Sequence, residues 1–135
     1  MEVTFALALL LGYLTVTQMA IPNFHAVIKQ CLEGSNVTSD LTWDIIKGNI
    51  KLDNATTNIL CGVRCIMFKF GFVDGNSNMA LDNILNHFGD LELKSKYKKY
   101  VDVCDNSDVD SATPCRKAFA LKECLDNQTR VMLSG

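Results

Sequence analysis

This sequence has few prolines and histidines, and it has no large excess of charge of either sign. Its 135 residues include two prolines, Pro22 and Pro114, and two histidines. Lys and Arg total 13 against 15 Asp and Glu, which gives a formal net charge of −2. A balance so close to neutral provides no polyanion-binding surface, so we expect no nucleic-acid partner. At roughly 100 to 200 residues per domain, the length also excludes a multidomain enzyme.

Catalytic and cofactor motifs are missing as well. The chain has no GxSxG, no HExxH and no phosphate-binding glycine loop. A small secreted phospholipase would need a His-Asp pair within a cysteine-rich helix, and His87-Phe-Gly-Asp90 does not supply one. Metal binding by Cys61 and Cys65 is the alternative interpretation. It would need CxxC spacing or a nearby His pair, and the sequence has neither. We therefore expect no enzyme, no metal and no cofactor.

Long apolar runs are confined to the first twenty residues. Val3 to Val16 is almost continuously apolar, and at roughly 20 residues per span it is too short to cross a bilayer. It is typical of a secretory signal, because the alternative of a buried first helix would need an amphipathic face that this run lacks. We predict a signal peptide over residues 1–20, cleaved near 17–20, and a secreted extracellular domain over residues 21–135.

Three sequons follow the predicted signal. Asn36, Asn54 and Asn127 are each followed at the second position by Thr, which makes them candidates for N-glycosylation. Such acceptors suit a secreted chain, and the sequence leaves their use open.

Six cysteines also follow the signal, and an even number in a secreted chain indicates a disulfide framework. On a helix, Cys61 and Cys65 project in nearly the same direction, so they need two different partners. Cys115 and Cys124 fall on opposite sides of a helix and cannot pair either. Of the fifteen pairings that six cysteines allow, ten remain open at this point.

Apolar residues recur at helical spacing along the whole domain, with almost no strand pattern, so the expected fold class is all-α. Capping residues, glycines and Pro114 set the expected ends of the helices. The six expected helices cover residues 24–31, 41–50, 53–71, 81–88, 93–104 and 114–125. Residues 126–135 are expected to form a tail.

The intervals between the cysteines carry a family resemblance. Written out, they are Cys31-x29-Cys61-x3-Cys65-x38-Cys104-x10-Cys115-x8-Cys124. This pattern resembles the signature of the insect odorant-binding proteins, including the pheromone-binding and general odorant-binding groups. The resemblance implies about six helices stapled by three disulfides around an apolar internal cavity. It also implies the bridges Cys31–Cys65, Cys61–Cys115 and Cys104–Cys124, and a carrier of odorants, pheromones or similar lipid-like molecules through aqueous fluid.

Candidate ligand-binding residues come from the apolar stripes of the expected helices. The expected wall consists of Ile59, Val63, Met67, Phe72, Ile84, Leu85, Phe88, Ala118 and Leu121. Thr57, Tyr97 and Tyr100 are the polar candidates for orienting a ligand hydroxyl or carbonyl. Met132, in an apolar segment of the tail, is expected either to cover the cavity mouth or to belong to a frayed terminus.

Two further features and two other functions stay open. His87 protonation would loosen a helix over the cavity, although a solvated side chain is the simpler interpretation. The lysines between Lys94 and Lys99 form a solvated face or dock on an anionic membrane or receptor. The alternative functions are a secreted interaction protein or effector on the same scaffold, and a lipid-handling module that opens on membranes. As a carrier, we expect a monomer or weak homodimer that delivers its ligand to a membrane chemoreceptor.

Overall fold

The structure, a computed structural model, describes residues 24–86, 91–105 and 113–134, and within these ranges it is helical. The described elements are α2 (Phe24–Gly34), η1 (Ser39–Leu41), α3 (Thr42–Ile46), η2 (Leu52–Asn54), α4 (Thr57–Lys69), α5 (Leu81–Asn86), α6 (Leu91–Asp102) and α7 (Pro114–Ser134). In this part of the chain the closest approach to a sheet is one isolated antiparallel bridge between Val73 and Met79. The prediction of an all-α fold of about six helices is confirmed, whereas the predicted signal lies outside the described residues.

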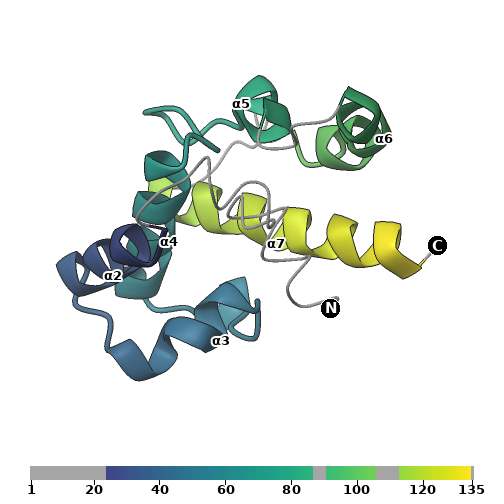
Figure 1. The fold of residues 1–135 in the computed structure, drawn as a ribbon. Coiled ribbons are helices and arrows are strands. Elements are labelled where there is room, and N and C mark those ends of the chain that lie inside the picture. Colours follow the sequence, from purple (N-terminus) through teal and green to yellow (C-terminus); the bar gives the residue numbers. More distant parts are fainter. Residues whose placement is uncertain (1–23, 87–90, 106–112, 135) are drawn as a thin grey trace.

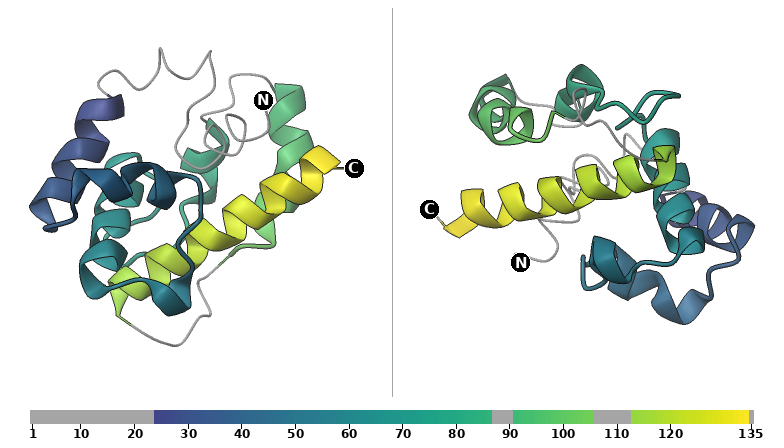
Figure 2. Two further views of the ribbon diagram at one scale, coloured as in Figure 1. Left: turned by 90° about the horizontal axis from the view of Figure 1, so that it is seen from below. Right: turned by 180° about the vertical axis from the view of Figure 1, so that it is seen from behind.

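Helices α4 and α7 form the centre of the fold. Helix α4 packs against α2 on one side and against α7 on the other, while α6 packs against both α5 and α7. In Figure 1, α5 and α6 lie above the long α7, and α2 and α3 lie on the lower left. Figure 2 shows the same division from behind, with α3 and α5 separated by α7. The arrangement encloses the apolar faces of α4 and α7 between two pairs of shorter helices.

Three disulfides fasten these helices together. Cys31–Cys65 joins α2 to α4, Cys61–Cys115 joins α4 to α7, and Cys104–Cys124 joins the segment after α6 to α7. These are the pairs that the family resemblance implies, and Cys61 and Cys65 have different partners as helix geometry requires. Each bridge contributes on the order of 2 to 4 kcal/mol to stability, so the framework does not depend on the apolar core alone.

The beginning of α4 differs from the sequence prediction. The chain forms the separate turn η2 where the helix was expected to begin, and α4 starts at Thr57. Thr56 is extended, and its Oγ1 accepts a hydrogen bond from the N–H of Ile59 at 3.3 Å, so Thr56 is the N-cap. The turn is held instead by α7, because the N–H of Leu52 donates to Glu123 Oε2 at 2.7 Å.

Helix α3 is shorter than the predicted helix over residues 41–50. It ends at Ile46, and Gly48 follows with φ of 77°. The N–H groups of Gly48 and Asn49 donate to the carbonyls of Ile45 and Asp44, at 3.2 and 2.9 Å. This pair of bonds is a Schellman motif, which terminates a helix wherever a residue without a Cβ can adopt the left-handed conformation.

The predicted tail over residues 126–135 is wrong, because α7 continues to Ser134. The expected helix ended near Leu125. The structure shows that Lys122, Asp126 and Thr129 are buried on α7. Thr129 Oγ1 donates to the carbonyl of Leu125 at 2.8 Å, which satisfies the hydroxyl within the helix.

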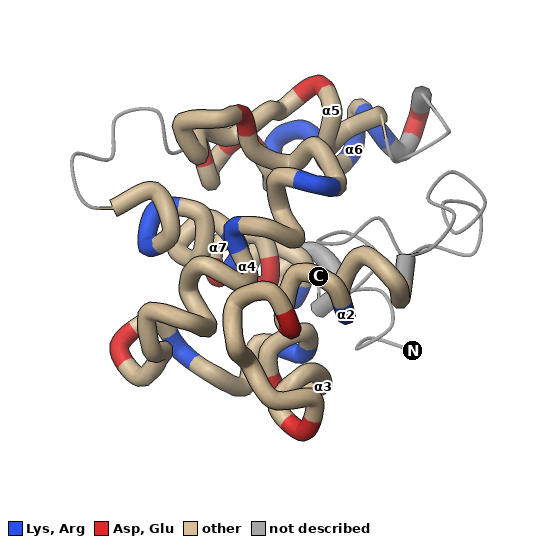
Figure 3. Tube along the Cα trace, turned by 90° about the vertical axis from the view of Figure 1, so that its left-hand side faces the viewer, with Lys and Arg blue, Asp and Glu red and all other residues tan. Residues whose placement is uncertain are grey.

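Charged residues of both signs are interleaved over the surface. On the side drawn in Figure 3, Lys and Arg are interspersed with Asp and Glu over the described helices, and neither sign of charge predominates. On α6, Lys96, Lys98 and Lys99 are exposed, and Lys94 Nζ donates to Asn86 Oδ1 on α5 at 3.2 Å. This interleaving agrees with the near-neutral charge of the whole chain.

Candidate functional site

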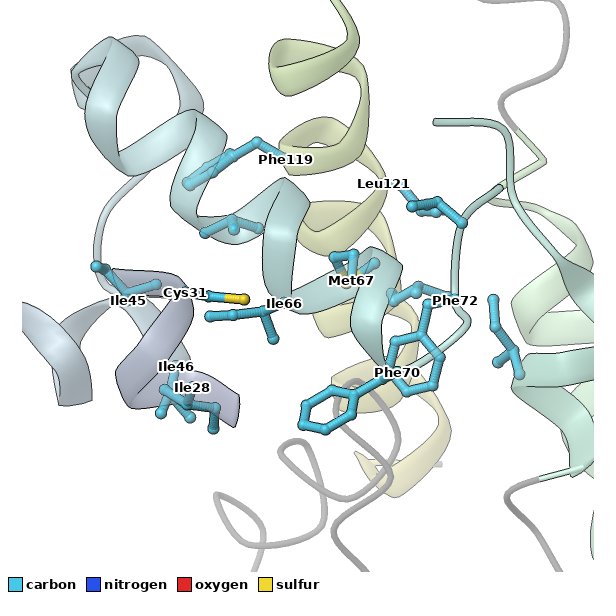
Figure 4. Close-up of a cluster of buried hydrophobic side chains, with 14 of the residues drawn as sticks. Ile28, Cys31, Ile45, Ile46, Ile66, Met67, Phe70, Phe72, Phe119 and Leu121 are labelled. Carbon is cyan, nitrogen blue, oxygen red and sulfur yellow. The ribbon is translucent and has the colours of Figure 1, made fainter. Parts of the chain in front are cut away.

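The end of α4 brings two of the candidate side chains together. Gly71, with φ of 78°, takes the left-handed position after the helix. Its N–H donates to the carbonyl of Phe68 at 3.0 Å, and the N–H of Phe72 donates to that of Met67 at 2.8 Å. A Schellman motif of this kind turns the residue after the glycine back onto the last helical turn. Phe72 therefore lies beside Met67, and Figure 4 shows both on the same side of α4.

The segment over residues 73–80, between α4 and α5, is fixed by side chains from the two central helices. Arg64 Nε on α4 donates to Ser77 Oγ at 2.9 Å. Lys117 Nζ on α7 donates to Asn78 Oδ1. Ser77 is fully buried, so these bonds satisfy polar groups that would otherwise destabilise the interior. The anchored segment sets the position of α5 and turns Ile84 and Leu85 towards the core.

Helix α6 contributes a buried hydroxyl to the apolar interior. Tyr97 is 4% exposed and belongs to the core cluster, and Tyr100 packs against that cluster half-buried. Burial raises the pKa of the Tyr97 hydroxyl above its ordinary value of 10.0. The hydroxyl is therefore protonated at physiological pH and can both donate and accept a hydrogen bond.

Helix α7 closes the interior along its buried face. Leu121 and Leu125, four residues apart, are at most 1% exposed, and Phe119 is 2% exposed. In Figure 4, Leu121 lies on the same side of α4 as Met67 and Phe72, while Ile28 and Ile45 lie on the opposite side. The side facing α5, α6 and α7 is therefore distinct from the side that packs on α2 and α3.

Six buried side chains lie on the side of α4 that faces α5, α6 and α7, and we call them the inner wall. Its members are Met67, Phe72, Ile84, Leu85, Tyr97 and Leu121, and all belong to one contiguous cluster. They come from α4, α5, α6, α7 and the turn after α4. The inner wall is apolar apart from the Tyr97 hydroxyl, so its chemistry suits an apolar molecule with one polar group and offers no nucleophile or acid-base pair.

A comparison with protein-family models now adds to the geometry: the model of the PBP/GOBP family matches residues 15–128. This chain belongs to that family, the insect pheromone-binding and odorant-binding proteins. The match spans the framework of three disulfides and all six cysteines, so the resemblance carried by the cysteine intervals is confirmed. No curated protein and no solved structure matches the chain.

Membership in the PBP/GOBP family places the chain among carriers of odorants and pheromones. These proteins bind their ligands and do not transform them. Within the described residues, no group of His, Cys, Asp and Glu side chains has the geometry to hold a metal ion. The same part of the chain contains no helix with both the length and the apolar content that a bilayer span requires.

The structure brings most of the candidate residues together. Ile59 and Val63 are buried in the same cluster as the inner wall, and Ala118 is fully buried on α7. Thr57 is exposed in the first turn of α4 and lies apart from the cluster. Phe88 and His87 lie outside the described residues, as does the side chain of Met132, although its backbone is part of α7.

Several members of the cluster were not among the sequence candidates. Phe70, Val101 and Leu125 are buried in it, and each follows another apolar member by four residues on a helix or at its end. That spacing is the signal that could have found them. The buried pair Lys122 and Asp126 has the same spacing. Charged residues are assigned to the solvated face by default, so the spacing did not predict that this pair is buried.

Proposed function

We propose that this PBP/GOBP family member is a secreted carrier that takes a small apolar ligand between α4, α5, α6 and α7. The ligand lies against the inner wall and reaches its destination through aqueous fluid. The observation that supports this most strongly is the clustering of apolar side chains from four helices around one buried hydroxyl. Met67 adds adaptability, because its unbranched thioether can repack around ligands of different shape.

Burial of apolar area drives the binding. A ligand with a chain of roughly ten to sixteen carbons buries about 300 to 400 Å², worth about 7.5 to 10 kcal/mol at ~25 cal/mol per Å². Loss of translational and rotational freedom costs at least about 4 kcal/mol. The remaining ~3.5 to 6 kcal/mol corresponds to dissociation constants between roughly 3 mM and 40 μM, so tighter binding needs a well-placed polar contact as well.

Displacement of a fluorescent naphthylamine dye tests the proposal. The dye emits strongly only in apolar surroundings, and straight-chain alcohols of increasing length compete for its place. The Met67→Ala variant removes side-chain volume from the inner wall and leaves more room for the ligand. The alcohol that binds best should therefore be longer by one or more carbons. Phe68→Ala is the matched control, because Phe68 is the next residue of α4 and is 48% exposed.

Three results would contradict this proposal. The first is no uptake of dye by the folded protein, and the second is no displacement by any alcohol. The third is an equal change of chain-length preference in Met67→Ala and Phe68→Ala, because that result would place the binding surface outside the inner wall. A filled interior with an exposed apolar patch would then favour the alternative of an interaction protein or effector.

Secretion and delivery complete the proposal. Residues 1–20 direct the chain out of the cell, and expression of the full chain in cultured insect cells should yield a product in the medium that begins near residue 21. We expect a monomer or weak homodimer in solution and handover to a membrane chemoreceptor. Sedimentation at increasing protein concentration measures the first of these, and a dominant, tight dimer would contradict it.

A further inference from the structure

The backbone conformation differs among the three sequons. In two of them, the exposure of the residues alternates as it does in an extended segment. Asn36 and Thr38 are exposed on either side of the buried Val37. In the third, Asn127 is exposed but Thr129, two residues later, is fully buried. Both residues matter, because the sequon is recognised through its asparagine and its hydroxyl residue together.

Geometry explains the difference. In an extended segment, side chains at positions i and i+2 project from the same face of the chain. In an α-helix they do not face each other, because successive residues are rotated by about 100°. The sequon at Asn127 lies inside α7. Its Thr129 hydroxyl is also engaged, donating to the carbonyl of Leu125 at 2.8 Å.

In the sequon at Asn54, the two residues after the asparagine are extended. Asn54 is the last residue of η2, and Ala55 and Thr56 follow with φ and ψ in the extended region. Asn54 and Thr56 are both exposed, and Ala55 between them is half-buried. The Thr56 hydroxyl accepts a hydrogen bond from the N–H of Ile59, which leaves its own proton free to be donated.

The sequon at Asn36 follows the end of α2. Asn36 adopts φ of 60° and its N–H donates to the carbonyl of Glu33 at 3.0 Å, while Val37 N–H donates to that of Leu32 at 2.9 Å. Asparagine is the residue that takes this left-handed position most readily after glycine. Thr38 is in the extended region and is the N-cap residue of η1, and its side chain accepts no hydrogen bond from an N–H of that turn.

We infer that Asn36 and Asn54 receive N-linked glycans and that Asn127 does not. In each transfer, the side-chain amide nitrogen of the asparagine attacks the anomeric carbon of a lipid-linked oligosaccharide pyrophosphate. A C–N bond forms, the bond from that carbon to the pyrophosphate oxygen breaks, the lipid pyrophosphate leaves, and the amide nitrogen gives up one proton. The reaction involves no oxidation or reduction.

The two glycans would not obstruct the inner wall. Asn36 and Asn54 flank the segment that contains α3, and Figure 1 shows this segment across α7 from α5 and α6. Neither residue belongs to the buried cluster. A glycan at either position is therefore compatible with ligand binding, and the α5 and α6 side of the protein stays bare.

Expression in cultured insect cells tests the inference, which rests on the proposed secretion. Two forms are compared, the full chain and a form in which a leader of established function replaces residues 1–20. Secretion is read from the first form and glycosylation from the second, so the two proposals can fail separately. Enzymatic release of N-glycans converts each occupied Asn to Asp, which peptide mass spectrometry then locates.

We expect conversion at residues 36 and 54 and an unmodified Asn127. Asn36→Gln and Asn54→Gln should each lose one glycan, the double variant should lose both, and Asn127→Gln should match the parent in mobility. A glycan on Asn127, or an empty Asn36 or Asn54, would overturn the inference. Helical circular dichroism of each secreted variant confirms that it has folded, so that a lost glycan is not a consequence of misfolding.

Discussion

Lys122 and Asp126 form an ion pair inside the protein, with Nζ and Oδ2 2.9 Å apart and each side chain 5% exposed. The pair lies where the segment after α3 meets α7, because a Cβ on Gly48 would come within 2.9 Å of Asp126 Oδ2. Charges removed from water are stable in a protein only when they are paired and hydrogen-bonded. These polar residues in the second half of α7 are thus part of its packing.

Removing one member of this ion pair should lower the free energy of unfolding more than replacing both members with apolar residues. Lys122→Met leaves the Asp126 carboxylate buried without its partner, which costs about 3 kcal/mol or more of the free energy of unfolding at neutral pH. The double variant Lys122→Met/Asp126→Leu should regain most of that loss, because it leaves no uncompensated charge. Urea denaturation measures all three proteins.

The exposed pair Lys29 and Glu33 on α2 provides the control, since its atoms are 4.0 Å apart and its side chains are 74% and 63% exposed. Lys29→Met should change the free energy of unfolding by about 0.5 kcal/mol or less. Equal losses in Lys122→Met and Lys29→Met would contradict the burial of the central pair.

The same carboxyl group should make stability depend on pH. Burial raises the pKa of Asp126 above its ordinary value of 3.8, against the opposing effects of Lys122, Arg130 and Lys51. Between 3.8 and the raised pKa, the folded state binds more protons than the unfolded state. The contribution of Asp126 to stability is therefore largest below this window, falls as pH rises through it and is constant above it.

Comparison with Asp126→Asn, which cannot titrate, isolates this contribution. The difference in free energy of unfolding between wild type and variant, measured at intervals from about pH 3 to pH 7, should shift in favour of wild type as pH falls. A shift in the other direction would mean that Lys122 lowers the pKa of Asp126 more than burial raises it.

Gly48 should tolerate no side chain. Its φ of 77° is unfavourable for other residues, and a Cβ there would press on Asp126 Oδ2 at 2.9 Å. Gly48→Ala should reduce the free energy of unfolding by about 1 to 3 kcal/mol. Gly34→Ala is the control: Gly34 ends α2 and has no neighbour within 4 Å of a Cβ, so thermal denaturation should show an unchanged or slightly higher Tm.

Tyr97 should orient the polar group of a ligand. Tyr97→Phe removes a hydroxyl from the inner wall and leaves the ring, so affinity for a long-chain alcohol should fall by about fivefold, near 1 kcal/mol. Affinity for the alkane of the same length should stay within about twofold, since it has no group to bond. Titration calorimetry with both ligands separates the two cases, and equal losses would assign Tyr97 to packing alone.

Regular periodicity made much of the fold predictable. Apolar residues at helical spacing located the helices that contain Val63 and Met67 and the one that contains Ile84 and Leu85. The exposed Thr57 shows what could not be predicted about the site. The sequence places a residue on a helix but does not tell which end of that helix reaches the interior. The disulfide order came from the family resemblance, since geometry left ten arrangements open.

Residues whose role depends on distant partners could not be predicted. Glu123 accepts a hydrogen bond from the backbone of Leu52, a contact between residues far apart in the chain, and this contact helps to keep η2 separate from α4. Thr129 and Asp126 are buried only because α7 continues beneath the rest of the fold. A pattern within one segment contains no information about such contacts.

Methyl NMR of the protein with a long-chain alcohol tests the central claim most directly. Methyl groups of Met67, Ile84, Leu85 and Leu121 should show large chemical-shift changes at saturation, because they line the inner wall. Those of Ile28 and Ile45, on the α2 and α3 side of α4, should change little. Changes confined to Ile28 and Ile45, or to exposed side chains such as Val103 and Val131, would contradict it.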